Sequence, residues 1–193
     1  MAGKKELIMA SAAKLLEKHN YKDITVLDIV SDSGVNRNTF YYHFKDMPSL
    51  VEELARRQVD RIFDKKQLSV DDKLRELVDC LYENRRTVMH VYNYADRAVF
   101  DKGLHGLSEH IVNCILDGRR ESFAGSDEEW ERTGLVCKSC VFGLISSLLL
   151  KCLPESEKDN IQKLCVDPLT NPSAILSLSS INKILILFPF FHL

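Results

Sequence analysis

The stretch from Thr25 to Phe44, TVLDIVSDSGVNRNTFYYHF, constrains the fold of this chain more than any other segment. It is typical of two short helices joined by a tight turn. Thr25, with Asp28 three residues later, forms the capping-box pattern that starts a helix. Gly34 suits the left-handed backbone that often ends a helix, and Asn36 can cap the next one. Such a helix-turn-helix unit presents its second helix to the major groove of DNA.

The second helix of this unit carries the side chains that suit DNA recognition. Its apolar residues can share one small core with those of the first helix. Arg37 could bind guanine and Asn38 adenine through two hydrogen bonds each, whereas the aromatic side chains and His43 can reach phosphates or thymine methyl groups. The alternative for any single residue is an ordinary solvated position on a helix. The outward residues are Arg37, Asn38, Thr39, Tyr41, Tyr42, His43 and Lys45.

Composition describes a regular, helix-rich chain without a strong overall charge. The sequence has 193 residues, of which 45% are hydrophobic and 28% charged, enough for one or two domains with a real core. The formal net charge is -2, so any basic surface must be local. Residues 1–66 hold 12 of the 26 Lys and Arg but only 10 of the 28 Asp and Glu, the sign expected of a DNA-binding end.

The N-terminal sequence lacks the uninterrupted apolar segment and cleavage site of a secretory signal, so we expect a cytoplasmic protein. The six cysteines are then expected to be reduced. The Cys137-x-x-Cys140 pattern lies in an apolar helical run, where thiols behave as small buried hydrophobes. A thiol redox sensor therefore stays an alternative interpretation only.

Helical spacing of apolar residues continues through the rest of the chain, and no alternating strand pattern of useful length occurs. We therefore predict an all-α fold. A helix precedes the two-helix unit, and Asp101, Gly103 and Gly106 are expected to interrupt a later one. Further helices are expected from Pro48 to about Lys66, from Ser69 onward, over 85–100, over 107–116, and from the Ser126 capping box to about Leu153.

Residues 5–54 resemble the TetR family of bacterial transcription regulators. The resemblance rests on a helix, then T-V-x-D-I-V-x-x-S-G-V-N-x-x-T-F-Y-Y-H-F-K-D, then an apolar helix beginning near Leu50. It implies a homodimer in which a three-helix N-terminal domain binds a palindromic double-stranded DNA operator. A helical domain for small-molecule effector binding and dimerisation follows. Residues 1–47, 48–170 and 171–193 would be the DNA-binding domain, the sensing domain and an apolar tail of uncertain structure.

The resemblance assigns DNA contacts residue by residue. Residues 36–39 and 41–43 match the recognition helix and its flanks, while Thr25 and Lys45 match positions that commonly touch phosphates. Met47 stands where the family often has a Lys, which should lower the salt dependence of binding by about one counterion. Ser33 stands where Ala usually precedes the Gly. Repression relieved by an effector is the family's commoner mode.

The region after residue 82 offers candidates for the sensing function. Tyr82 to Arg85 and the segment that follows are similar to the Firmicutes-type C-terminal domain, a subgroup with activators of dihydroxyacetone kinase operons. Aromatic and histidine side chains gather within the 21 residues from 90 to 110, which suits an apolar effector pocket with polar anchors. Ordinary aromatic packing is the alternative, and the histidine spacing does not favour a metal site. The candidates are His90, Tyr94, Phe100 and His110.

The apolar run from Leu135 to Leu150 suits a dimer helix, because such a face exposed on a monomer would favour aggregation. The interface candidates are Leu135, Phe142, Ile145 and Leu149. The tail contains Lys183, Pro189 and several polar residues, so we do not expect membrane insertion. We expect no cofactor and no enzymatic activity, because no nucleophile with a positioned base stands out. A helical small-molecule enzyme whose N-terminal unit binds proteins is the remaining alternative.

Overall fold

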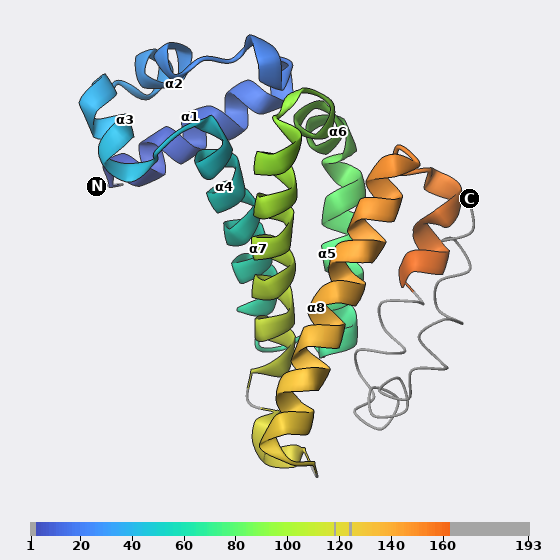
Figure 1. Cartoon of the computed structure of the whole chain (residues 1–193). Helices are drawn as coiled ribbons and strands as arrows, with labels where there is room; N and C mark the ends of the chain where they lie inside the picture. The colour runs from blue at the N-terminus through green and yellow to red at the C-terminus, as the bar shows by residue number, and fades with distance from the viewer. Residues whose placement is uncertain (1–2, 118, 124, 163–193) are drawn as a thin grey trace. The chain divides into compact units, whose positions relative to one another are not determined.

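The computed structural model describes residues 3–117, 119–123 and 125–162, and these residues form helices without strands (Figure 1). The predicted all-α fold class is confirmed. The apolar tail at 171–193 lies outside the described residues. The elements are α1 (Lys4–Lys18), η1 (Tyr21–Asp23), α2 (Val26–Ser33), α3 (Arg37–His43), α4 (Met47–Phe63), α5 (Val70–Glu83), α6 (Arg85–Tyr94), α7 (Arg97–Leu116), η2 (Arg120–Ser122), α8 (Asp127–Leu150) and η3 (Glu155–Glu157).

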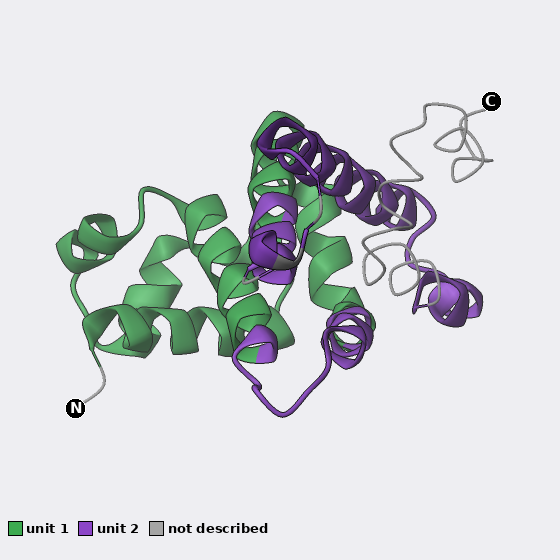
Figure 2. Ribbon diagram, turned by 90° about the horizontal axis from the view of Figure 1, so that it is seen from below, with its two compact units in different colours: residues 1–61, 80–107 green, residues 62–79, 108–193 purple. Residues whose placement is uncertain are grey.

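Two compact units make up the chain (Figure 2). The first contains residues 1–61 and 80–107, and the second contains residues 62–79 and 108–193. In the first unit, α1, α2 and α3 pack on one another around a core in which Ile8, Ile29 and Phe40 are fully buried. The Ser11 hydroxyl donates to the Ile29 carbonyl at 3.2 Å and ties α1 to α2. This core holds the helix-turn-helix in place.

The turn between α2 and α3 has the predicted backbone. Gly34 ends α2 with a φ of 68°, a left-handed conformation that costs other residues free energy because of their Cβ atom. Thr25 and Asp28 form the predicted capping box at the start of α2, and Asn36 caps α3. Local sequence signals therefore fix both ends of the turn.

The predicted interruption of a helix at residues 101–106 is wrong. Helix α7 runs through Gly103 and Gly106 without a break, and the chain turns instead at Ala95, whose backbone is extended. The Asp96 carboxylate accepts a hydrogen bond from the Val99 amide at 3.0 Å and so starts α7. A glycine inside a helix costs only about 1 kcal/mol relative to alanine, which packing can offset.

Helix α8 starts at the predicted capping box but ends at Leu150, before the expected Leu153. Cys152 and Leu153 have φ values of 59° and 50°, and the Leu153 amide donates to the Leu148 carbonyl at 2.8 Å. This hydrogen bond satisfies a carbonyl at the end of the helix. Helix α4 likewise ends earlier than expected, at Phe63.

Candidate nucleic-acid interface

Helix α3 has one buried and one exposed side, which suits a recognition helix. Phe40 and Phe44 are buried in the core of the first unit, with ring centroids 5.8 Å apart. Tyr42 has 84% of its surface exposed and Tyr41 has 46%. Arg37, Asn38 and Lys45 are also exposed. A seven-residue helix cannot be stable alone, so packing of Phe40 presents these side chains to the solvent.

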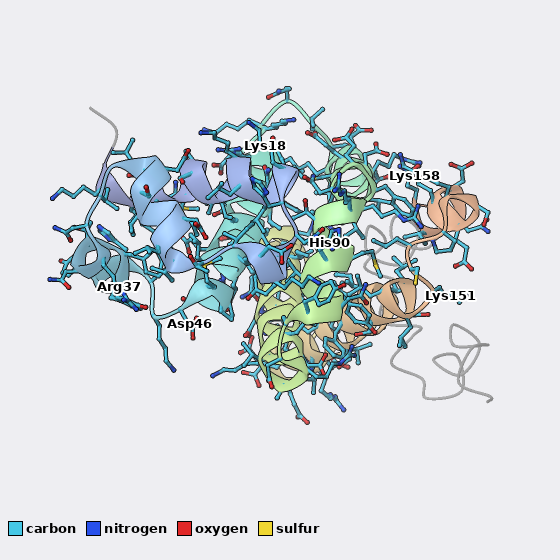
Figure 3. The ribbon with its side chains drawn as sticks, turned by 90° about the horizontal axis from the view of Figure 1, so that it is seen from above. Lys18, Arg37, Asp46, His90, Lys151 and Lys158 are labelled. Carbon is cyan, nitrogen blue, oxygen red and sulfur yellow. The ribbon has the colours of Figure 1, made fainter. Side chains whose placement is uncertain are left out.

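Arg37 and Tyr41 form a pair one helical turn apart on the exposed side of α3. An Arg37 guanidinium N–H donates to the Tyr41 hydroxyl at 3.4 Å, and the guanidinium carbon lies 5.5 Å from the centre of the Tyr41 ring. The exposed Arg37 is labelled in Figure 3. A cation held over an aromatic ring loses less side-chain entropy when it binds a base or phosphate. The pair therefore prepares Arg37 for a directional contact.

Tyr42 and His43 extend the same surface. Their ring centroids are 4.9 Å apart and their planes lie at 82°, an edge-to-face arrangement. His43 is only half-buried. The highly exposed Tyr42 has a ring able to contact thymine methyl groups and a hydroxyl able to donate to a phosphate.

Asn36 and Thr39 have a structural role beside their predicted DNA contacts. The Asn36 side-chain oxygen accepts from the Thr39 amide at 2.8 Å and from the Thr39 hydroxyl at 3.0 Å. The first bond satisfies a backbone amide at the start of α3. The side-chain amide nitrogen of Asn36 keeps its two N–H donors. Asn36 can therefore cap the helix and donate to DNA at once.

Thr25 is likewise held in a local hydrogen-bond arrangement at the start of α2. Its hydroxyl donates to the Asp28 carboxylate at 2.6 Å and its amide donates to the same carboxylate at 2.8 Å. These hydrogen bonds lower the pKa of Asp28 below its ordinary value, and the bond from the Thr25 hydroxyl has the larger effect. Because both groups are exposed, the capping box lies at the surface.

Met47, which differs from the residue that the family often has at this position, lies at the start of α4. Met47 is partly buried against the core of the first unit, so it adds apolar contact where the family often has a Lys. The Asp46 carboxylate accepts from the Ser49 amide at 2.9 Å and starts α4. An open cleft of about 260 Å³ lies beside this segment. Its lining residues are Lys5, His43, Phe44, Lys45, Ser49, Glu52, Glu53 and Arg56.

The predicted effector-binding residues fall into separate contacts. The rings of His90 and Tyr94 stack on α6, with centroids 6.2 Å apart and planes at 14°, and His90 is labelled in Figure 3. The Lys22 ammonium of η1 lies 4.9 Å from the Tyr94 ring centre. Phe100 instead packs edge-to-face on Tyr92 at 5.4 Å. Their role in effector binding stays a prediction.

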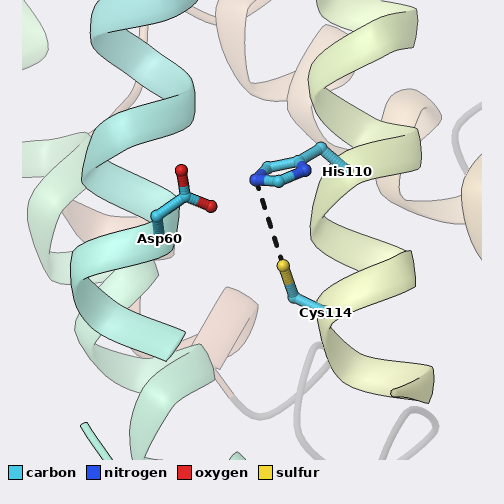
Figure 4. A group of neighbouring side chains, drawn as sticks. All are labelled: Asp60, His110 and Cys114. Carbon is cyan, nitrogen blue, oxygen red and sulfur yellow. Dashed lines mark hydrogen bonds between the residues drawn. The ribbon is translucent and has the colours of Figure 1, made fainter. Parts of the chain in front are cut away.

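His110, the fourth effector candidate, belongs to the second unit. Its ring nitrogen Nε2 lies 4.0 Å from the Cys114 Sγ, one turn further along α7 (Figure 4). Both side chains are half-buried. The spacing of four residues on one helix accounts for this contact.

Helix α8 presents some of the predicted dimer residues to the solvent. Leu135 has 65% of its surface exposed, and Phe142 and Ile145 are half-buried. Leu149 has only 1% of its surface exposed in the single chain. Its side chain is therefore already buried within the single chain, which leaves little of it for a partner.

The two cysteines of the C-x-x-C pattern are held in their protonated form. Burial, with a smaller contribution from Cys140, raises the pKa of Cys137 to about 11. Burial also raises the pKa of Cys140. Because the thiolate is the reactive species, neither side chain is poised for redox chemistry at neutral pH.

Sequence reasoning missed the ion pairs that join α4 to α1. Lys5 on α1 pairs with Glu53 at 2.6 Å, and Arg57 pairs with Glu6 at 3.0 Å. The spacing of Glu53 and Arg57, four residues apart on a helix, is visible in the sequence and was the available signal. The partners on α1 could be found only from the structure.

Comparison with known proteins supports the interpretation of this surface. Residues 8–54 match the family model described as bacterial regulatory proteins, tetR family, and this range covers most of α1, all of α2 and α3, and the first turns of α4. The match is to the N-terminal domain of that family. A search of curated protein sequences finds no match to the chain.

Solved structures of regulators share the fold of the chain. A TetR transcriptional regulator from Rhodococcus sp. RHA1 gives a TM-score of 0.62 at 17% identity, over 86% of this chain and 94% of that one. The dihydroxyacetone kinase operon activator DhaS gives a TM-score of 0.57 at 16% identity, again over 86% and 94%. At these identities the likeness shows the fold alone. The fold of the chain is thus one that these two regulators also have.

Proposed function

We propose that the protein is a ligand-responsive, TetR-like transcription regulator that binds a palindromic operator as a homodimer. The observation that carries this proposal is the exposed side of α3, where Arg37, Tyr41 and Tyr42 stand on a helix anchored by Phe40. These side chains lie within the range that matches the family. In a dimer, two copies of α3 would enter successive major grooves about 34 Å apart.

In this proposal, each predicted domain has its own binding function. Residues 1–47 bind DNA, and residues 48–170 bind the effector and a second copy. The proposed dimer has one conformation whose recognition helices match the half-site spacing of the operator and one whose helices do not. An effector that binds the second conformation more tightly lowers the population of dimers that can bind DNA. Helix α4 carries this coupling, because it begins at Met47 beside the DNA-binding core and continues beyond it. Repression relieved by the effector is the proposed mode.

The C-terminal domain is proposed to be of the Firmicutes type, because of the resemblance that begins at Tyr82. The proposed location is the cytoplasm, and no catalytic role is assigned. Within the described residues, α8 is long and apolar enough to cross a membrane. Core helices of soluble proteins can have the same length and composition, and Lys138 in the middle of α8 forms an ion pair with Glu109 at 2.7 Å. Dimer contact is our explanation of the apolar side of α8.

The recognition surface can be tested with an operator selected from random duplexes by the unmodified protein. We expect Arg37→Ala to lower operator affinity by about 5- to 150-fold per lost base contact and to relax the preference at one base pair. Tyr42→Ala should lower affinity as well, while Tyr42→Phe separates the contribution of the hydroxyl from that of the ring. Lys18→Ala is the matched control, because it removes the same charge from an exposed position of α1. Unchanged affinity and base preference in both alanine variants would refute the assigned surface.

A further inference from the structure

Helix α7 places a thiol beside a base within the second unit. The Cys114 Sγ lies 4.0 Å from the Nε2 of His110, which precedes it by one helical turn, and Figure 4 shows the imidazole directed at the sulfur. Hydrogen bonds of catalytic pairs are often long before the reactant is bound and shorten in its complex. In the tautomer that carries its proton on Nδ1, the Nε2 of His110 can accept the thiol proton. The pair can therefore produce a thiolate, the reactive form of cysteine.

The fold holds this pair at the border of the buried side of α7. Ile111, Val112 and Ile115 have at most 3% of their surface exposed, and their burial fixes the rotation of the helix about its axis. His110 and Cys114 are turned by about 100° from the residues that follow them, and both are half-buried. The pair is thus held in position and is still accessible to a small molecule.

Three other thiols differ from Cys114 in their burial or in the group beside them. Burial raises the pKa of Cys137 to about 11, so this thiol stays protonated. The Cys80 sulfur accepts a hydrogen bond from the Asn84 side-chain amide at 3.6 Å, and an amide does not take up the thiol proton. Cys152 is exposed and follows the end of α8. Accessibility alone would therefore make Cys152 react first, whereas a neighbouring base favours Cys114.

We propose that Cys114 and His110 form a covalent site for α,β-unsaturated carbonyl compounds, and that such electrophiles are the effector class of the protein. The inference rests on the proposed function and names the chemistry of its input. Addition to an activated alkene needs a nucleophile and a group that moves a proton. The thiol and the imidazole supply these two functions.

The addition is balanced by the two side chains and the electrophile alone. His110 takes the thiol proton, and the thiolate sulfur bonds to the β-carbon while the carbon–carbon π bond breaks. The imidazolium then returns its proton to the α-carbon. One S–H bond and one π bond are lost, and one C–S bond and one C–H bond form. No oxidant or reductant takes part.

Methyl vinyl ketone, a small member of this class, can serve as the probe. Limited exposure of the full chain, followed by peptide mass spectrometry, gives the rate of adduct formation at each cysteine. We expect Cys114 to react at least about 10-fold faster than Cys152, because a well-placed base contributes about 100-fold or more. In protein unfolded by urea the two rates should become equal, because unfolding separates the base from the thiol.

Substitution of His110 distinguishes an active base from a passive neighbour. We expect His110→Gln, whose amide cannot take up the proton, to slow the Cys114 reaction at least about 10-fold and to leave the Cys152 rate unchanged. His105→Gln is the matched control, because it removes an imidazole from an exposed position of the same helix. The site would be overturned if Cys114 reacts no faster than Cys152 in the folded protein, or reacts equally fast in His110→Gln.

Operator binding tests whether the site receives the effector. The Cys114 adduct should lower affinity for the selected operator at least about 5-fold, whereas the same treatment should not change the affinity of Cys114→Ser. An adduct at Cys114 that leaves operator affinity unchanged would overturn the effector class. If the unmodified protein selects no operator, the proposed function itself fails, and the adduct rates, which are measured without DNA, distinguish that result from a failure of the site.

Discussion

Substitutions of Asn36 can distinguish its role as a helix cap from its predicted contact with DNA. Its oxygen accepts from the Thr39 amide at 2.8 Å, while its two N–H donors remain able to bind DNA. Replacement of an N-cap by alanine costs about 1 kcal/mol. For a chain of this size, that loss lowers the melting temperature by roughly 2–4 °C. Asn36→Ser keeps a capping oxygen and removes the amide donors, so its melting temperature should stay close to that of the unmodified protein.

Operator affinity should respond differently from stability in these two variants. A hydrogen bond to a charged partner contributes about 1.5–3 kcal/mol, so loss of a phosphate contact should weaken binding at least about 10-fold. We expect this loss in Asn36→Ala, measured by fluorescence anisotropy at fixed salt, and a smaller loss in Asn36→Ser, whose hydroxyl keeps one donor. Full affinity in Asn36→Ala would refute the DNA contact and leave Asn36 as a cap only. A drop in melting temperature as large in the serine variant as in the alanine variant would refute the capping argument.

Two further predictions concern the loss of stability at low pH and the oligomeric state. The lowered pKa of Asp28 means that its carboxylate stabilises the folded chain above the ordinary carboxyl pKa, and that this contribution is lost as the pH falls through the lowered value. The melting temperature of Asp28→Asn should therefore fall less than that of the unmodified protein between about pH 4 and pH 2. An equal fall in both proteins would contradict this prediction. Light scattering at micromolar concentration should give twice the 22.1 kDa chain mass, and Leu135→Asp should shift it towards the single chain. A stable monomer of the unmodified protein would contradict the dimer.

Signals confined to a few neighbouring residues predicted the structure well. The Thr25–Asp28 and Ser126–Glu129 capping boxes and the left-handed Gly34 all occur as expected. In each case the side chain satisfies backbone groups within three residues, or the backbone itself requires glycine. No distant partner is needed, so the sequence pattern contains the whole cause.

Features that depend on distant partners could not be predicted in this way. Gly106 of α7 looks like a helix breaker in the sequence, whereas in the fold it lies inside α7 beside the Glu52–Arg56 pair of α4. Leu149 looks like any other apolar residue of α8 until the fold buries it. The apolar pattern of a helix gives the side that avoids water. It does not say whether the same chain or a second copy covers that side.

Because several cations near α3 are paired with carboxylates, the preference for one DNA sequence over another should depend mainly on the side chains of α3. Met47 packs against the core, and Lys5, Arg56 and Arg57 are each paired with a carboxylate. A cation paired in this way contributes little net attraction for phosphates, because the neighbouring carboxylate cancels much of its field. Nonspecific binding is almost entirely electrostatic, whereas hydrogen bonds and apolar contacts from α3 depend on the bases. Reduced phosphate attraction therefore weakens binding to arbitrary DNA more than binding to the operator, which raises the ratio of specific to nonspecific affinity.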